Sequence, residues 1–236
     1  MFIKEAMGVF WQTLKDTWEE LYSLAIVNLV WLFSWALPIS LGSATRIIIV
    51  IILTGLISLG LFPITTAGVY YVAHRVAQGR TFHFSDFIEG IKLYWWRSLL
   101  WLLANMVVTG LLVLNIWFYP NTFKGSWVVL VSGFWLAVLF FWLTIQLYFW
   151  PMLIQQEKPR IFMAWRNSAF LVLAGPFYAF FMVCFTLVLG GLSLVLTLPF
   201  IFVGMAILAV LGNNAVIRLL VRFKIIQDPR PKPIHG

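Results

Sequence analysis

Two sets of aromatic and amide side chains in this sequence could form a binding site. In each set the spacing is three, four or seven residues, which places its members on one face of a helix. The two sets are Asn28, Trp31 and Trp35, and Trp135, Trp142 and Gln146. Indole rings offer flat apolar surfaces, and indole and amide groups exchange hydrogen bonds with hydroxyl or headgroup oxygens. If both faces line one cavity, we expect it to hold a sugar or a lipid headgroup. The alternative is tight aromatic packing between helices.

No motif for catalysis or metal binding accompanies these residues. The sequence has no His-Glu-x-x-His, Gly-x-Ser-x-Gly or phosphate-loop pattern, and His74, His83 and His235 are scattered. The middle of every apolar run also lacks Asp, Glu, Lys and Arg. An ionisable residue there would mark a proton or ion pathway. We therefore expect a non-enzymatic protein without a metal or cofactor, and proton-coupled transport is disfavoured.

The composition is typical of an integral membrane protein. Of 236 residues, 62% are hydrophobic and 10% are charged, against about 45–50% and 25% in soluble domains. Each apolar run has about the 20 residues that are needed to cross a bilayer. The runs are 22–41, 47–71, 98–119, 127–154, 169–189 and 192–217. The sequence thus predicts an all-α polytopic protein with six transmembrane helices over residues 21–222.

Two features of these runs have specific consequences. Pro63 interrupts the second run, which is either a kinked full span or a re-entrant half-helix. Gly190 and Gly191 separate the last two runs, and we expect a tight turn there.

The charged residues are sorted by side. Of the 16 Lys and Arg residues, all but Arg46 and Lys124 fall on one side of the six runs, together with all 8 acidic residues. Because an excess of Lys and Arg marks cytoplasmic loops, we predict that both termini are cytoplasmic. The net charge of +8 does not indicate nucleic-acid binding, since the basic residues flank helix ends, where they meet anionic lipid headgroups.

Two cytoplasmic segments are expected to be amphipathic interfacial helices. In residues 1–20, aromatic and aliphatic residues share one face, and Lys4, Glu5, Lys15, Asp16, Glu19 and Glu20 share the other. A second apolar stripe lies in residues 84–97, where Ser85 is placed to cap the helix. We expect lipid or a partner protein to contact Trp11, Trp18, Phe84, Phe87, Trp95 and Trp96. Residues 223–236 are basic and proline-rich and are predicted to be a flexible tail.

Several short motifs resemble the YesL family of bacterial membrane proteins. Asn28 to Ile39 (Asn-Leu-Val-Trp-Leu-Phe-Ser-Trp-Ala-Leu-Pro-Ile) resembles the Asn-Leu-x-Trp-Leu…Leu-Pro-Ile run of its first span. Residues 62–72 resemble its Pro-x-x-Thr-x-Ala-x-Tyr stretch, and Gln78-Gly79-Arg80 with the following aromatic residues resembles its next loop. These motifs cover about the first half of the chain.

The resemblance implies a multi-pass protein of the bacterial plasma membrane whose role is uncharacterised. Genes of the YesL type tend to accompany carbohydrate-uptake systems, which points to an accessory subunit of a sugar ABC transporter. The competing hypothesis is a transporter or substrate-capture protein that binds a small polar ligand between the two Trp and amide faces. A role in lipid or envelope maintenance is a third alternative.

Overall fold

The computed structural model describes residues 2–230 and shows an all-helical chain. No strand occurs within this range. In chain order the helices are α1 (Phe2–Glu19), α2 (Leu21–Ala44), α3 (Ile48–Ala77), α4 (Phe84–Thr122), α5 (Trp127–Ile154), α6 (Ile161–Ala174), α7 (Pro176–Leu196), the π-helix η1 (Phe200–Gly204) and α8 (Met205–Arg222). Six helices are long and apolar enough to cross a membrane: α2, α3, α4, α5, α7 and the continuous η1–α8 helix.

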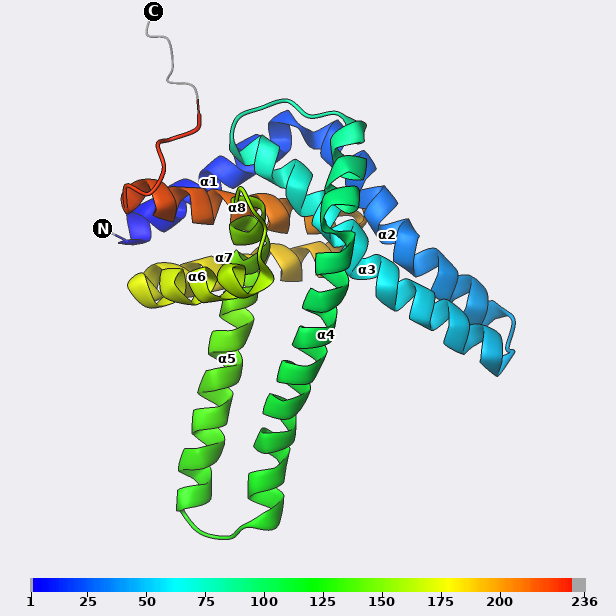
Figure 1. Cartoon of the computed structure of the whole chain (residues 1–236), viewed down its shortest axis with the longest axis vertical. Helices are drawn as coiled ribbons and strands as arrows, with labels where there is room; N and C mark the ends of the chain where they lie inside the picture. Colours follow the sequence, from blue (N-terminus) through cyan, green and yellow to red (C-terminus); the bar gives the residue numbers. More distant parts are fainter. Residues whose placement is uncertain (1, 231–236) are drawn as a thin grey trace, which may run out of the picture.

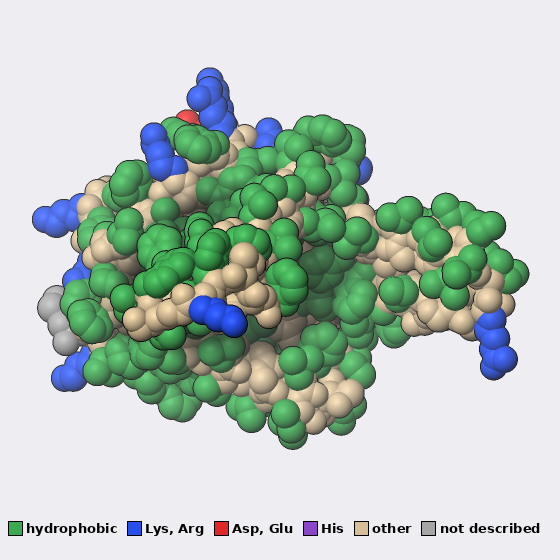
Figure 2. Space-filling model, turned by 90° about the horizontal axis from the view of Figure 1, so that it is seen from below, with side chains coloured by type: hydrophobic (Ala, Val, Ile, Leu, Met, Phe, Trp, Pro, Cys, Tyr) green, Lys and Arg blue, Asp and Glu red, His purple; other side chains and the backbone are tan. Residues whose placement is uncertain are grey.

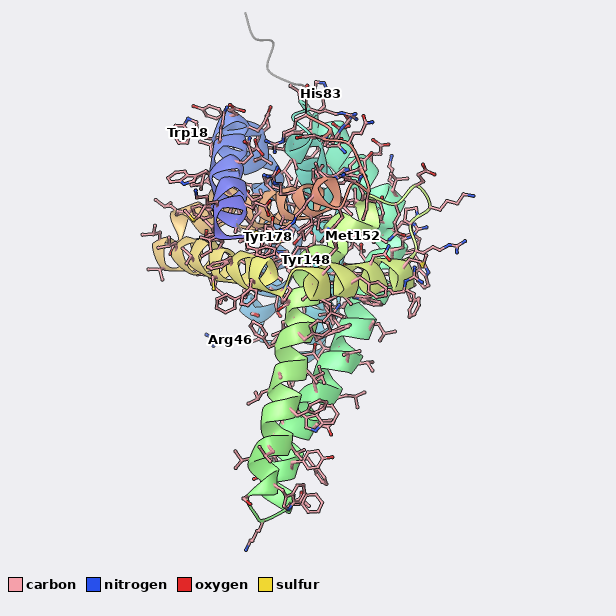
Figure 3. The ribbon with its side chains drawn as sticks, turned by 90° about the vertical axis from the view of Figure 1, so that its left-hand side faces the viewer. Trp18, Arg46, His83, Tyr148, Met152 and Tyr178 are labelled. Carbon is pink, nitrogen blue, oxygen red and sulfur yellow. The ribbon has the colours of Figure 1, made fainter. Side chains whose placement is uncertain are left out.

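These six helices do not run side by side. Helices α4 and α5 form a long hairpin that projects from the rest of the molecule, and the α2–α3 hairpin diverges from it (Figure 1). Helices α6, α7 and α8 lie crosswise to α5 in two perpendicular views (Figures 1 and 3). Of these six helices, η1–α8 is the most deeply buried, with 67% of its most apolar stretch inside the molecule. The reason is that α1, α3 and α5 all pack against α8.

The face of the molecule seen from below is mostly apolar (Figure 2). Hydrophobic side chains cover most of it, and few Lys or Arg side chains interrupt them. On the projecting hairpin, large side chains such as Leu103 and Leu130 are more than half exposed. Soluble monomers rarely expose apolar patches larger than a few hundred Å². The fold therefore suits a lipid environment.

Pro63 does not break its helix. Helix α3 is continuous from Ile48 to Ala77, so the half-helix alternative for this segment is wrong. Near the proline, the hydroxyls of Thr65 and Thr66 donate hydrogen bonds to the carbonyls of Leu61 (2.9 Å) and Phe62 (2.7 Å). Each hydroxyl bonds the carbonyl four residues before it, whereas the carbonyl that Pro63 leaves without its helical N–H partner is that of Leu59.

The helix boundaries in the second half differ from the predicted ones. Gly175 separates α6 from α7 inside the predicted run 169–189, because Pro176 cannot continue the first helix and is well placed to start the next. Helix α7 continues through Gly190 and Gly191, so the predicted turn there is wrong. The chain reverses instead at Thr197, which has a φ of 56°, and Pro199 precedes η1.

The start of α4 also differs from the prediction. The helix begins at Phe84, and Asp86 accepts a hydrogen bond from the backbone N–H of His83 at 2.8 Å. Asp86 also pairs with Arg75 of α3. Thus His83, rather than Ser85, is the N-cap residue of α4. Asp86 accepts the His83 N–H from the first turn, and its ion pair fixes α4 to the end of α3.

Candidate functional site

Asn28 is buried at the centre of the packing between α2, η1 and α8. Its Nδ2 donates hydrogen bonds to the carbonyls of Phe200 (3.0 Å) and Ile201 (2.7 Å). Its Oδ1 accepts from the backbone N–H groups of Met205 (2.9 Å) and Ala206 (3.1 Å). A π-helix departs from the α-helical hydrogen-bond pattern, and this one amide bonds four backbone groups in and beside it. The structure therefore gives Asn28 a structural role.

The other members of the first face pack against α3. Trp31 is buried, and its Nε1 donates to Thr66 Oγ1 at 2.9 Å. The Trp35 ring meets Trp31 and Phe62 edge to face, with centroid separations of 5.6 and 5.9 Å. Its indole N–H is buried without a hydrogen-bond partner among residues 2–230.

The second face contacts α4 and α6. Gln146 Oε1 accepts a hydrogen bond from Trp101 Nε1 at 2.9 Å, and Trp142 Nε1 donates to Thr109 at 3.2 Å. The Trp142 ring also packs on Trp165 of α6. Trp135 lies nearer the start of α5 and is partly buried. The two predicted faces thus meet different helices, and their role in ligand binding stays a prediction.

Most of the predicted contact residues are accessible, but one is not. Trp11 and Trp18 are 62% and 76% exposed on α1, and Phe84, Trp95 and Trp96 are about half exposed on α4. Phe87 is only 1% exposed. Its ring fills the space beside Gly68 of α3, where the absent side chain lets the two helices approach closely. Phe87 is therefore a core residue, and its predicted contact with lipid or a partner is wrong.

Helix α1 turns two acidic residues towards the protein. The expected polar face included Glu5 and Asp16, yet Asp16 is only 6% exposed, and Glu5 is partly buried. Asp16 Oδ2 accepts hydrogen bonds from Asn214 Nδ2 (2.9 Å) and Arg230 Nη2 (2.7 Å). Its Oδ1 accepts from Gln12 at 2.7 Å. Asp16 can face the protein instead of solvent because Arg230 and two amides replace the water that an exposed carboxylate would bind.

A second ion pair fixes the other end of α1. Glu5 Oε2 accepts from Arg222 Nη1 at 2.8 Å, and Arg218 lies 3.8 Å from Glu5 Oε1. The Arg222 guanidinium also sits 4.4 Å above the centre of the Phe2 ring. Since Glu5 meets the end of α8 and Asp16 meets Asn214 nearer its start, α1 and α8 run antiparallel with their polar faces together.

The described part of the C-terminal tail is docked rather than free. Arg230 donates to Asp16, to Asn214 Oδ1 (2.8 Å) and, through Nε, to the carbonyl of Ala77 (3.0 Å). Within residues 223–230, Arg230 thus pairs with a buried carboxylate, and the flexibility of this tail stays a prediction. Residues 231–236 of that predicted tail lie outside the described range.

A cavity of about 450 Å³ lies between α1, α8 and the segment 223–230. We call it the α1–α8 cavity. Its lining combines charged, amide and apolar side chains: Lys4, Glu5, Gly8, Val9, Gln12, Asn214, Ile217, Arg218, Val221, Asp228 and Arg230. None of the six predicted ligand-binding residues lines it. No local sequence pattern indicates this cavity, since its walls come from the two ends of the chain.

Comparison with known proteins gives one match. Residues 24–116 match the model of a family described as Protein of unknown function, DUF624. The matched range runs from the start of α2 to the outer part of α4, which includes the motifs at residues 28–39 and 62–72. No curated protein and no solved structure matches the chain. All the residues that line the α1–α8 cavity therefore lie outside the matched range.

Proposed function

We propose that this chain is a YesL-type accessory subunit of the bacterial plasma membrane, without enzymatic activity. In this proposal it supports carbohydrate uptake by binding permease or ATPase subunits of a sugar ABC transporter. The matched family of unknown function and the six long apolar helices are consistent with a YesL-type membrane protein. The sorting of charges supports cytoplasmic termini.

One observation carries the proposal of a partner surface. Four Trp residues, Trp11 and Trp18 on α1 and Trp95 and Trp96 on α4, are at least 49% exposed. The labelled residues Trp18 and His83 lie at the same end of the molecule, far from Arg46 (Figure 3). Exposed Trp residues supply much of the binding energy in protein interfaces. Because Glu5 and Asp16 fix α1 to α8, the aromatic surface of α1 is held ready for a partner.

The test is a cross-linked pull-down of the tagged full chain from its native membrane, read by mass spectrometry. We expect enrichment of transporter permease or ATPase subunits. The double variants Trp11→Ala/Trp18→Ala and Trp95→Ala/Trp96→Ala should reduce that enrichment. Trp117→Ala is the matched control, because Trp117 is 64% exposed near the far end of α4. Recovery of the chain alone from native membranes would refute the accessory role.

Substrate capture is the competing proposal. It requires the amide and indole groups of α2 and α5 to face a ligand, whereas Asn28, Trp31 and Gln146 bind other parts of the protein. Unchanged binding of candidate sugars after Trp142→Phe and Gln146→Leu would count against that alternative.

A further inference from the structure

The α1–α8 cavity opens beside an apolar stripe of the interfacial helix. Lys4, Gly8 and Gln12 line the cavity at intervals of four residues, so they form one edge of α1. The residues that directly precede these three in the sequence form a second stripe, rotated by about 100° around the helix axis. That stripe consists of Ile3, Met7 and Trp11, which are 58%, 38% and 62% exposed. A molecule with a polar head and apolar tails could therefore place its head in the cavity and its tails along α1.

The charges around the cavity leave two cations available for a ligand. Glu5 is neutralised by Arg222 at 2.8 Å, and Arg230 is engaged by Asp16. Arg218 reaches Glu5 only at 3.8 Å, and its side chain is 49% exposed. Within residues 2–230, Lys4 forms no ion pair with an acidic residue. Asp228 is the remaining carboxylate, and it accepts the backbone N–H of Arg230 at 3.1 Å.

We propose that the α1–α8 cavity binds the phosphate of an anionic phospholipid headgroup. Lys4 and Arg218 contact the phosphate, Gln12 offers the amide N–H that does not bind Asp16, and the acyl chains lie on the stripe Ile3–Met7–Trp11. A volume of about 450 Å³ falls in the range of small-molecule sites, roughly 300–1,000 Å³. Basic pockets at the cytoplasmic ends of membrane helices attract anionic headgroups by the same electrostatics.

Gly8 provides a sharp test of this site. A Cβ at Gly8 would meet no atom within 4 Å, so a larger side chain would fill open space without disturbing the core. Gly8→Leu should therefore obstruct the cavity while the fold persists. Lys4→Gln and Arg218→Gln remove the phosphate contacts and leave the Glu5–Arg222 pair in place. Lys15→Gln is the matched control, because Lys15 is 68% exposed on the same helix and, within residues 2–230, forms an ion pair with Glu19 alone.

The experiment titrates the purified full chain with phosphatidylglycerol and measures bound lipid by native mass spectrometry. We expect saturable binding that weakens about 5-fold for each lost cation and more than 10-fold in Gly8→Leu. Lys15→Gln should bind like the wild type, and thermal unfolding of each variant checks its fold. Equal affinity in Gly8→Leu and both charge variants, or equal affinity for phosphatidylcholine, would overturn the proposal.

A second arm separates a lipid headgroup from free phosphate. Inorganic phosphate offers the same anionic oxygens but cannot use the apolar stripe of α1. We therefore expect millimolar phosphate to leave phosphatidylglycerol bound, and its displacement would overturn the assignment to lipid. The site does not depend on the accessory function, since lipid binding would persist if the pull-down recovered the chain alone.

Discussion

Asp16 is held by side chains from three separate parts of the sequence. Gln12 lies one turn away on α1, Asn214 lies on α8, and Arg230 follows the last helix. Burial of a carboxylate costs several kcal/mol unless a cation and hydrogen-bond donors compensate. Asp16 therefore stabilises the docking of α1 only while Arg230 remains in place.

Loss of Arg230 should destabilise the docked α1. We expect Arg230→Gln to lower the free energy of unfolding by about 2 kcal/mol, since a buried carboxylate loses its cation but keeps two amide donors. Asp16→Asn in the same chain should restore most of the loss, because the amide carries no charge. Thermal unfolding in detergent measures both effects. Arg80→Gln, at an exposed position with no ion pair within residues 2–230, is the control.

Sequence reasoning could not find this cluster at the residue scale. The periodicity of residues 1–20 correctly predicts a helix with an aromatic face, and Trp11 and Trp18 are exposed as expected. The same pattern assigns every charged residue to water, because a helical face carries no information about a cation 214 positions away. Only the fold brings Arg230 to Asp16, and the partner of a buried charge is invisible in a local pattern.

Among the helices, α3 and α4 cross at an unusually close distance, and two glycines allow it. A Cβ at Gly68 would lie 2.7 Å from the Phe87 ring and 2.9 Å from the Phe87 carbonyl oxygen. A Cβ at Gly90 would lie 2.6 Å from the Cβ of Tyr71. Small residues at such crossings let backbones approach and gain van der Waals contact, which drives helix association in lipid.

Substitution at this crossing should therefore be costly. We expect Gly68→Ala to destabilise the protein by about 1–3 kcal/mol, because the added methyl group forces α3 and α4 apart. Gly60→Ala in the same helix is the matched control, since a Cβ there meets no atom within 4 Å. Its stability should stay within about 1 kcal/mol of the wild type. Similar melting temperatures for the two variants would contradict the close crossing.

The sequence predicts the helices of the first half better than those of the second. The first four apolar runs correspond to α2, α3, the outer part of α4 and α5, because charged or polar loops separate them. The last two runs have no charged residue between them, so glycine is the remaining signal for a turn. Gly190 and Gly191 stay helical, whereas Gly175 ends a helix because Pro176 follows it. The proline, rather than the glycine pair, was the informative residue.

At the scale of the whole molecule, charged residues mark the turns of two hairpins but not the turn between α7 and α8. Arg46 and Lys124 mark the turns of the first two hairpins, so the positive-inside rule orients α2–α3 and α4–α5. The connection between α7 and α8 at residues 197–199 carries no charge. The α7–α8 hairpin could cross the membrane or lie along its inner surface, and in both cases the chain returns to the same side. The predicted cytoplasmic position of the C-terminus is thus compatible with both arrangements.

Cysteine labelling in intact cells can distinguish the two arrangements. In a Cys184→Ala background, Lys124→Cys should react with a membrane-impermeant maleimide from outside, and Lys158→Cys should react only after permeabilisation. Leu198→Cys decides the question, because Leu198 is 65% exposed in the α7–α8 connection. Since α7 and η1–α8 are each long and apolar enough to cross a membrane, we expect Leu198→Cys to be labelled from outside at the rate of Lys124→Cys. Labelling of Leu198→Cys only after permeabilisation would mean that the α7–α8 hairpin lies along the inner surface, and six transmembrane helices would then be wrong.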